Sequence, residues 1–144
     1  MKFDELGKKR RAYETATDCC VPEGNFMIAR IDGRSFSKLT KENHDFEAPF
    51  DVRFRDMMIE TTKHLMNCGF RVNYGYTESD EISLLFHIDE TLFGRKLRKY
   101  ISVLAGEASS VFSLALGEAA CFDARISILP NEKLVVDYFR WRNE

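Results

Sequence analysis

Hydrophobic positions recur along the chain with two different spacings, which predict strands and helices in a definite order. Apolar residues lie on both faces of the segment from Asn25 to Asp32, which predicts a buried strand. From Pro49 to Cys68, and again from about Thr91 to Leu116, apolar residues recur every three or four positions, as in an amphipathic helix. Apolar and polar residues alternate in three further segments, which predicts three more strands at residues 72–76, 82–88 and 121–129.

These six elements follow the order β-α-β-β-α-β. The polar turn Thr77–Asp80 joins the second and third strands into a hairpin. Right-handed connections fold this order into one antiparallel sheet with both helices on one face. The predicted fold class is therefore α+β, a ferredoxin-like βαββαβ layer. Two helical segments flank it: residues 3–17, which end before Pro22-Glu23-Gly24, and residues 132–142.

Length and composition narrow the class of protein. The 144 residues allow one domain with its own core. A formal net charge of -2, from 21 basic and 23 acidic residues, excludes a protein that coats nucleic acid with its whole surface but allows a local basic face. No run approaches 18 apolar residues, and residues 1–5 are charged, unlike a secretory signal. We therefore expect a soluble cytoplasmic protein with no membrane partner.

The cysteines and histidines do not favour a zinc site. None of the four cysteines forms a C-x-x-C pair, and the three histidines lack the spacing of metal ligands. We expect reduced thiols with a structural role.

Two acidic residues that are far apart in the sequence meet in this topology. Asp32 ends the first strand and Asp80 precedes the third, so two carboxylates 48 positions apart lie at one edge of the sheet. Such close charges raise a pKa or recruit a cation, and hard oxygen ligands suit Mg²⁺. The loop Gly33–Ser37 follows directly, and successive N–H groups after a glycine can hold a phosphate. Each motif alone is more often an ordinary turn, but their convergence favours a site.

A basic cluster opens the second predicted helix. Its positive charges recur at helical spacing, and a triphosphate or an RNA backbone is a plausible partner. A cluster of this kind is by default a solvated helix face. Tyr74 and Tyr76 favour packing between strands over a platform for stacking bases. The residues proposed for phosphate or RNA contacts are Arg95, Lys96, Arg98 and Lys99.

Four ordered motifs, which span the chain from about residue 5 to its end, resemble the tRNA-histidine guanylyltransferase family and its shorter bacterial and archaeal relatives, the 3′-to-5′ RNA polymerases. The resemblance implies a palm domain, as in polymerases and cyclases, that uses two Mg²⁺ ions. The motifs are Arg30-Ile31-Asp32-Gly33-Arg34-Ser35-Phe36, Tyr74-Gly75-Tyr76-Thr77-Glu78-Ser79-Asp80-Glu81, Phe122-Asp123-Ala124-Arg125 and Tyr138-Phe139-Arg140-Trp141-Arg142.

The resemblance also implies residue roles. Asp32 and Asp80 would bridge the metal ions with the Gly33 carbonyl as a third ligand, and Glu81 would complete the catalytic set as a ligand or by supporting one. The implied nucleotide site comprises Asp32, Gly33, Arg34, Ser35, Phe36, Ser37, Ser79 and Asp80. His44 and Asp51 fall in a segment where the family has a lysine; Glu47 replaces it here.

The implied reaction reverses ordinary chain growth. The 5′ end of a tRNA carries the activated phosphate, as a triphosphate or after adenylylation by ATP. The 3′-hydroxyl of an incoming GTP attacks it, and pyrophosphate or AMP leaves. This would guanylylate tRNA-His or repair tRNA 5′ ends. The implied partners are tRNA and nucleoside triphosphates, and we expect a homo-oligomer.

Residues 1–144 are expected to form a single catalytic palm domain with a helical flank at 1–24. The family has a further helical region after the motif that ends at Arg142, whereas this sequence stops at Glu144. We therefore expect a catalytic fragment or a minimal form that binds nucleotide and metal but engages tRNA weakly. Two alternatives stay open: a cyclase-type palm enzyme acting on GTP or ATP, and a truncated, non-catalytic nucleotide-binding module.

Overall fold

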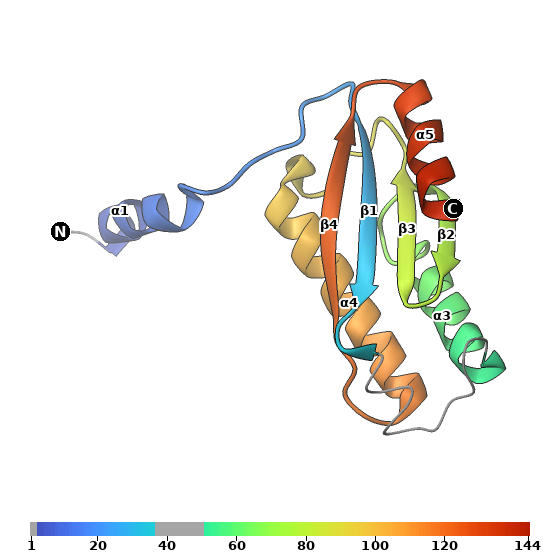
Figure 1. The fold of residues 1–144 in the computed structure, drawn as a ribbon. Coiled ribbons are helices and arrows are strands. Elements are labelled where there is room, and N and C mark those ends of the chain that lie inside the picture. The colour runs from blue at the N-terminus through green and yellow to red at the C-terminus, as the bar shows by residue number, and fades with distance from the viewer. Residues whose placement is uncertain (1–2, 37–50) are drawn as a thin grey trace.

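The computed structural model describes residues 3–36 and 51–144 and contains one four-stranded antiparallel sheet (Figure 1). The strands lie side by side in the order β2-β3-β1-β4, which confirms the predicted α+β arrangement. β1 is therefore central and pairs with β3 on one side and with β4 on the other. The strand bounds are Phe26–Gly33 for β1, Val72–Glu78 for β2, Glu81–Phe86 for β3 and Phe122–Leu129 for β4.

Two helices, α3 (Val52–Leu65) and α4 (Leu97–Leu116), cover one face of the sheet, as predicted (Figure 1). Asp51 caps α3, because its carboxylate accepts hydrogen bonds from the backbone N–H groups of Arg53 and Phe54 at 2.8 and 3.3 Å. The predicted helix 91–116 is divided: a short 3₁₀ helix, η2 (Leu92–Arg95), precedes α4. The chain has positive φ angles from residue 93 to residue 95, which a continuous α-helix does not allow.

The core lies between the sheet and these two helices. Phe86, Tyr100 and Phe112 are the largest fully buried side chains there. In β1, Ile28 and its neighbour Ala29 are both inaccessible to solvent, which agrees with the expected strand buried on two faces.

The second face of β1 is covered by α5 (Glu132–Asn143), which packs on the side of the sheet opposite α3 and α4 (Figure 1). The Tyr138 hydroxyl lies 3.0 Å from the Ser83 hydroxyl on β3. The Tyr74 ring packs edge-on against Phe139 with ring centres 4.9 Å apart. Tyr74 therefore packs against α5, rather than against a neighbouring strand as expected, and remains 48% exposed.

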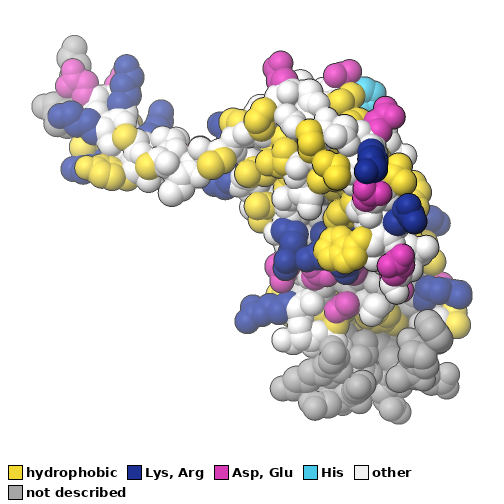
Figure 2. Space-filling view, turned by 45° about the horizontal axis from the view of Figure 1, so that its top comes forward, with side chains coloured by type: hydrophobic (Ala, Val, Ile, Leu, Met, Phe, Trp, Pro, Cys, Tyr) yellow, Lys and Arg dark blue, Asp and Glu magenta, His cyan; other side chains and the backbone are white. Residues whose placement is uncertain are grey.

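The predicted N-terminal helix is α1 (Phe3–Thr15), which extends away from the sheet and has no buried residues (Figure 1). Both basic and acidic side chains project from it (Figure 2). All four cysteines are free thiols. Among the described residues, no helix is long and apolar enough to cross a membrane.

Candidate functional site

The carboxyl end of β1 and the start of β3 bring acidic residues together. Asp32 pairs across the sheet with Glu81 on β3 and with Asp123 on β4. The backbone N–H of Gly33 donates to the carbonyl of Asp80 at 2.9 Å. Asp32 and Asp80 therefore lie on adjacent strand ends, although 48 positions separate them in the sequence.

Burial is the largest influence on the pKa values of Asp32 and Asp80. It raises the pKa of Asp32 above its ordinary value, an effect that Arg30 opposes and Glu81 reinforces. Burial likewise raises the pKa of Asp80, while its own backbone N–H lowers it and Glu81 raises it further. Arg30 Nε lies 3.4 Å from Asp32 Oδ2, and Arg125 also lowers the pKa of Asp32, whereas no ion pair with Asp80 is found among the described residues. The arrangement leaves negative charge that a bound cation can offset.

The donor set fits Mg²⁺. This ion is typically held by one or two carboxylates and completes its octahedral shell with water and phosphate oxygens. Asp32 and Asp80 supply two carboxylates, and the Gly33 carbonyl is a further oxygen at the same strand end. Within residues 3–36 and 51–144, no three acidic, histidine or cysteine side chains converge on one point. The metal-binding roles of these residues stay a prediction.

Glu81, expected to be a ligand or to support one, is directed toward α5. It forms two hydrogen bonds with Arg142, and the contact from Arg142 Nε to Glu81 Oε2 is 2.8 Å. Its pairing with Asp32 still places its backbone beside the two aspartates.

The loop after β1 differs in detail from the expected phosphate-binding turn. The N–H groups of Gly33 and Arg34 donate to the carbonyls of Asp80 and Cys121, so neither is available to an anion. Ser35 has a positive φ of 59°. Ser37, also expected in the nucleotide site, lies outside the described residues, as do His44 and Glu47.

Phe36 corrects the expectation for this loop most directly. Its side chain is 3% exposed and packs in the core against Phe54, Phe112 and Phe122. A Cβ atom on Gly33 would lie 2.6 Å from Phe36 Cγ. The glycine therefore accommodates this aromatic ring, and the Phe36 side chain is core rather than part of a nucleotide site.

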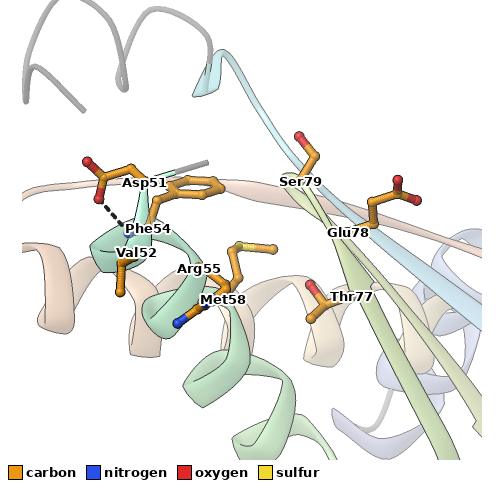
Figure 3. A pocket seen from close by; sticks show the side chains of 8 residues that line it. All are labelled: Asp51, Val52, Phe54, Arg55, Met58, Thr77, Glu78 and Ser79. Carbon is orange, nitrogen blue, oxygen red and sulfur yellow. Dashed lines mark hydrogen bonds between the residues drawn. The ribbon is translucent and has the colours of Figure 1, made fainter. Parts of the chain in front are cut away.

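A cavity of about 250 Å³ opens beside the hairpin turn, between β2 and the first turns of α3 (Figure 3). Phe54 and Met58 extend from α3 toward the hairpin, where Thr77 and Ser79 face them (Figure 3). Ser79, predicted for the nucleotide site, has a positive φ of 54° and directly precedes Asp80. The cavity is lined by Asp51, Val52, Phe54, Arg55, Met58, Thr77, Glu78 and Ser79.

Sequence reasoning missed most of this cavity. The helical spacing of the apolar residues of α3 predicts an amphipathic helix but not that some of them line a cavity. Met58 belongs to the buried core and Phe54 packs against that core, so the same side chains serve both the core and the cavity, and helical spacing does not separate these roles.

The basic cluster lies at the opposite end of the sheet from the aspartates. Arg95 is 5% exposed, and its guanidinium donates to five backbone carbonyls that surround the start of β1. Phe26 and Asp32 are six residues apart on β1, which corresponds to about 20 Å at ~3.3 Å per residue. The expectation that Arg95 contacts phosphate was wrong, and the cluster is too far from Asp32 to hold a triphosphate bound there. The five acceptors are the carbonyls of Val21, Pro22, Asn25, Ile88 and Glu90.

The other three basic residues of the cluster are more accessible. Arg98 forms an ion pair with Asp18 at 2.8 Å, and the Lys99 ammonium lies 5.6 Å from the centre of the Phe93 ring. Lys96 is exposed. Contacts of these residues with RNA stay a prediction.

Comparison with known proteins identifies relatives of this chain. The family model described as tRNAHis guanylyltransferase matches residues 7–130. The tRNA(His) guanylyltransferase of Schizosaccharomyces pombe is 32% identical over 133 residues, which cover 87% of this chain and 50% of that protein. The probable tRNA(His) guanylyltransferase of Drosophila melanogaster is 31% identical over 125 residues, 81% of this chain and 43% of that protein.

A solved structure agrees with the sequence relatives. A bacterial tRNA(His) guanylyltransferase-like protein in complex with GTP aligns with a TM-score of 0.86 and 33% identity, over 96% of this chain and 64% of that one. The chain thus spans about half the length of its curated relatives. Since the family model matches most of the sequence, the chain belongs to the tRNAHis guanylyltransferase family.

Proposed function

We propose that this chain is a nucleotidyltransferase that adds a nucleotide to the 5′ end of a tRNA, in the 3′-to-5′ direction. The observation that carries the proposal is that Asp32 and Asp80, two partly buried acidic residues, lie on adjacent strand ends that are hydrogen-bonded to each other. Family membership supports the reaction class, and a tRNA substrate accords with the cytoplasmic location expected from the sequence. The expected homo-oligomer remains part of the proposal.

In this proposal Asp32, Asp80 and the Gly33 carbonyl hold Mg²⁺. Bound Mg²⁺ would favour ionisation of the attacking hydroxyl and neutralise charge on the phosphates. The two aspartates hold negative charge at a fixed place, because β1 and β3 are hydrogen-bonded to each other at this end of the sheet. Metal ligands at fixed positions would help to hold the attacking hydroxyl and the phosphate in line. This positioning is the main requirement of phosphoryl transfer.

The nucleoside of the incoming GTP would occupy the cavity between α3 and the hairpin. Phe54 and Met58 offer apolar contact area, and Thr77 and Ser79 add hydroxyl groups to the lining. The bacterial relatives were solved with GTP and with ATP, which supports both nucleotides as substrates. The cavity lies next to Asp80, so the triphosphate of a nucleotide held there can reach the carboxylates.

The direct test is incorporation of labelled GTP into a 5′-truncated tRNA in the presence of Mg²⁺. We expect slow incorporation by the unchanged chain, because it engages tRNA weakly, and a further loss of at least ~100-fold in Asp32→Asn and Asp80→Asn, since either change removes a charge from the proposed metal site. Asp89→Asn is the matched control, because Asp89 is exposed and lies at the other end of β3. Unchanged incorporation in both site variants would refute the proposal.

The same assay distinguishes the alternatives. A cyclase-type palm would convert GTP to a cyclic product without RNA, whereas the proposed enzyme requires the tRNA. A non-catalytic module would bind GTP and produce neither product.

A further inference from the structure

The last turn of α5 lies over the outer face of the acidic strand ends. There Arg142 binds Glu81 through two hydrogen bonds, one from Nε to Oε2 at 2.8 Å and one from Nη2 to Oε1. The Arg142 and Glu81 side chains are only 22% and 13% exposed. Paired, partly buried contacts of this kind are stronger and more directional than surface ion pairs.

Trp141 fixes the guanidinium of Arg142 in place. The Arg142 Cζ atom lies 4.3 Å from the centre of the Trp141 ring, and the Arg30 Cζ atom lies 5.7 Å from it. Arg30 in turn approaches Asp32, and its Nε has no hydrogen-bond partner in the described part of the chain. Of the two arginines beside Trp141, Arg30 therefore faces Asp32 and Arg142 faces Glu81. These two carboxylates belong to residues that pair across the sheet.

Glu81 would otherwise be a competing ligand. It pairs directly with Asp32 and follows Asp80 in the chain, so three carboxylates belong to one strand end. In the described residues, however, three such side chains converge nowhere. The two hydrogen bonds from Arg142 hold the Glu81 carboxylate against α5.

We infer that Arg142 is a positioning residue for the Glu81 carboxylate, an inference that rests on the proposed metal site. Arg142 neutralises Glu81 and holds that carboxylate out of metal coordination, which leaves a site of two carboxylates, Asp32 and Asp80. The cation then keeps open positions for phosphate oxygens of the substrates, as Mg²⁺ sites of this reaction class require.

Loss of Arg142 alone should leave α5 in place. The helix is also held by the contact between Tyr138 and Ser83 and by the Tyr76 hydroxyl, which donates to Asn143 Oδ1 at 2.9 Å. Variants at position 142 can therefore be compared as folded proteins, and their thermal unfolding verifies this.

The test measures Mn²⁺ binding by electron paramagnetic resonance, without nucleotide or RNA. Arg142→Gln exposes the charge of Glu81, so we expect Mn²⁺ to bind about five- to tenfold more tightly. Glu81→Gln leaves Arg142 unpaired, so binding should weaken by a similar factor. The double variant restores the charge balance and should bind within about twofold of the unchanged chain.

Two controls test whether the effect on Mn²⁺ binding requires a positive charge at position 142 itself. Arg142→Lys keeps the charge and should bind Mn²⁺ nearly as the unchanged chain does. Arg140→Gln removes an exposed charge from the same helix without touching Glu81 and should leave binding unchanged.

The possible failures are distinguishable. If Arg142→Gln and Glu81→Gln both weaken binding, or both leave it unchanged, Arg142 serves only to dock α5, and the inference is overturned while the proposed function stands. If the unchanged chain binds no Mn²⁺, the proposed metal site fails and this inference fails with it.

Discussion

Gly33 shows that a sequence motif does not by itself reveal the physical role of a residue. The Asp32-Gly33 sequence suggested a backbone that comes close to a ligand, yet the structure places the Phe36 ring where a Gly33 side chain would be. The position needs glycine for packing, whatever else the loop binds. A motif read from sequence identifies the residue but not the neighbour that constrains it.

Gly33→Ala should therefore destabilise the protein. The new Cβ would lie 2.6 Å from Phe36 Cγ, and the buried ring cannot move without disturbing the core. We expect a loss of about 1–3 kcal/mol in the free energy of unfolding, measured by urea denaturation. Gly106→Ala is the control: its Cβ would meet no atom within 4 Å, and alanine should stabilise α4 by about 0.5–1 kcal/mol. Equal stability of the Gly33 variant and the unchanged chain would contradict the packing argument.

Glu90 makes stability depend on pH. Burial alone would raise the pKa of Glu90, but hydrogen bonds from the backbone N–H groups of Arg71, Leu92 and Thr91 outweigh it and lower the pKa below its ordinary value. A group with a lowered pKa stabilises the fold above its ordinary pKa and loses that contribution as the pH falls through the lowered value. Glu90→Gln should therefore cost about 1–3 kcal/mol at pH 7.

Below about pH 4.3, the ordinary pKa of a glutamate, the difference between Glu90→Gln and the unchanged chain should shrink progressively. Urea denaturation at a series of pH values measures this difference. Asp89→Asn, at an exposed neighbouring position, should show no comparable trend. A constant difference down to pH 3 would mean that the Glu90 charge does not contribute.

Some helices and strands of this fold pack through contacts that their hydrophobic patterns do not predict. The periods of two and of three to four residues predicted the four strands and the helices α3 and α4, because each of these elements buries one face or two against the same core. The outer position of α5 was not predicted. It depends on particular pairs, Tyr138 with Ser83 and Arg142 with Glu81, which lie 55 and 61 positions apart.

Arg95 is the clearest example of a contact between elements that the hydrophobic pattern does not predict. In a cluster of four basic residues it resembles a solvated helix face. Arg95 nevertheless joins the segment before β1 to the segment after β3 through five carbonyls. The turn before α4, in which residues 93–95 have positive φ angles, buries the Arg95 side chain. The spacing of hydrophobic residues does not predict such a turn.

Replacement of Arg95 tests its role between elements. Arg95→Met leaves several buried carbonyls without donors, so we expect a loss of about 3 kcal/mol or more in the free energy of unfolding. Arg95→Lys should rescue little, because an ammonium cannot reproduce the planar set of donors. Lys96→Met, at the exposed neighbouring position, should stay within about 0.5 kcal/mol of the unchanged chain. Guanidinium denaturation measures all three, and a tolerant Arg95→Met variant would exclude a structural role.

At the scale of the whole molecule, the candidate site exists only when the sheet is complete. Asp32 and Asp80 come from strands that are neighbours in space but separated in sequence by α3 and β2, so the unfolded chain cannot hold them together. This convergence was predictable, because the β-α-β-β-α-β order constrains which strand ends meet. The cavity beside it was not, because it depends on how far the first turn of α3 lies from the hairpin.

Ligands that need both aspartates should therefore stabilise the folded chain as a whole. At concentrations about 100-fold above its dissociation constant, a complex of Mg²⁺ and GTP should add about 2.7 kcal/mol, or roughly 6–10 °C in the melting temperature. The increase should disappear in Asp80→Asn and on chelation of the metal, and persist in Asp89→Asn. Calorimetry measures each shift. Since the unfolded chain lacks the site, an equal shift in Asp80→Asn would mean that the nucleotide binds elsewhere and that the two strand ends do not form the site.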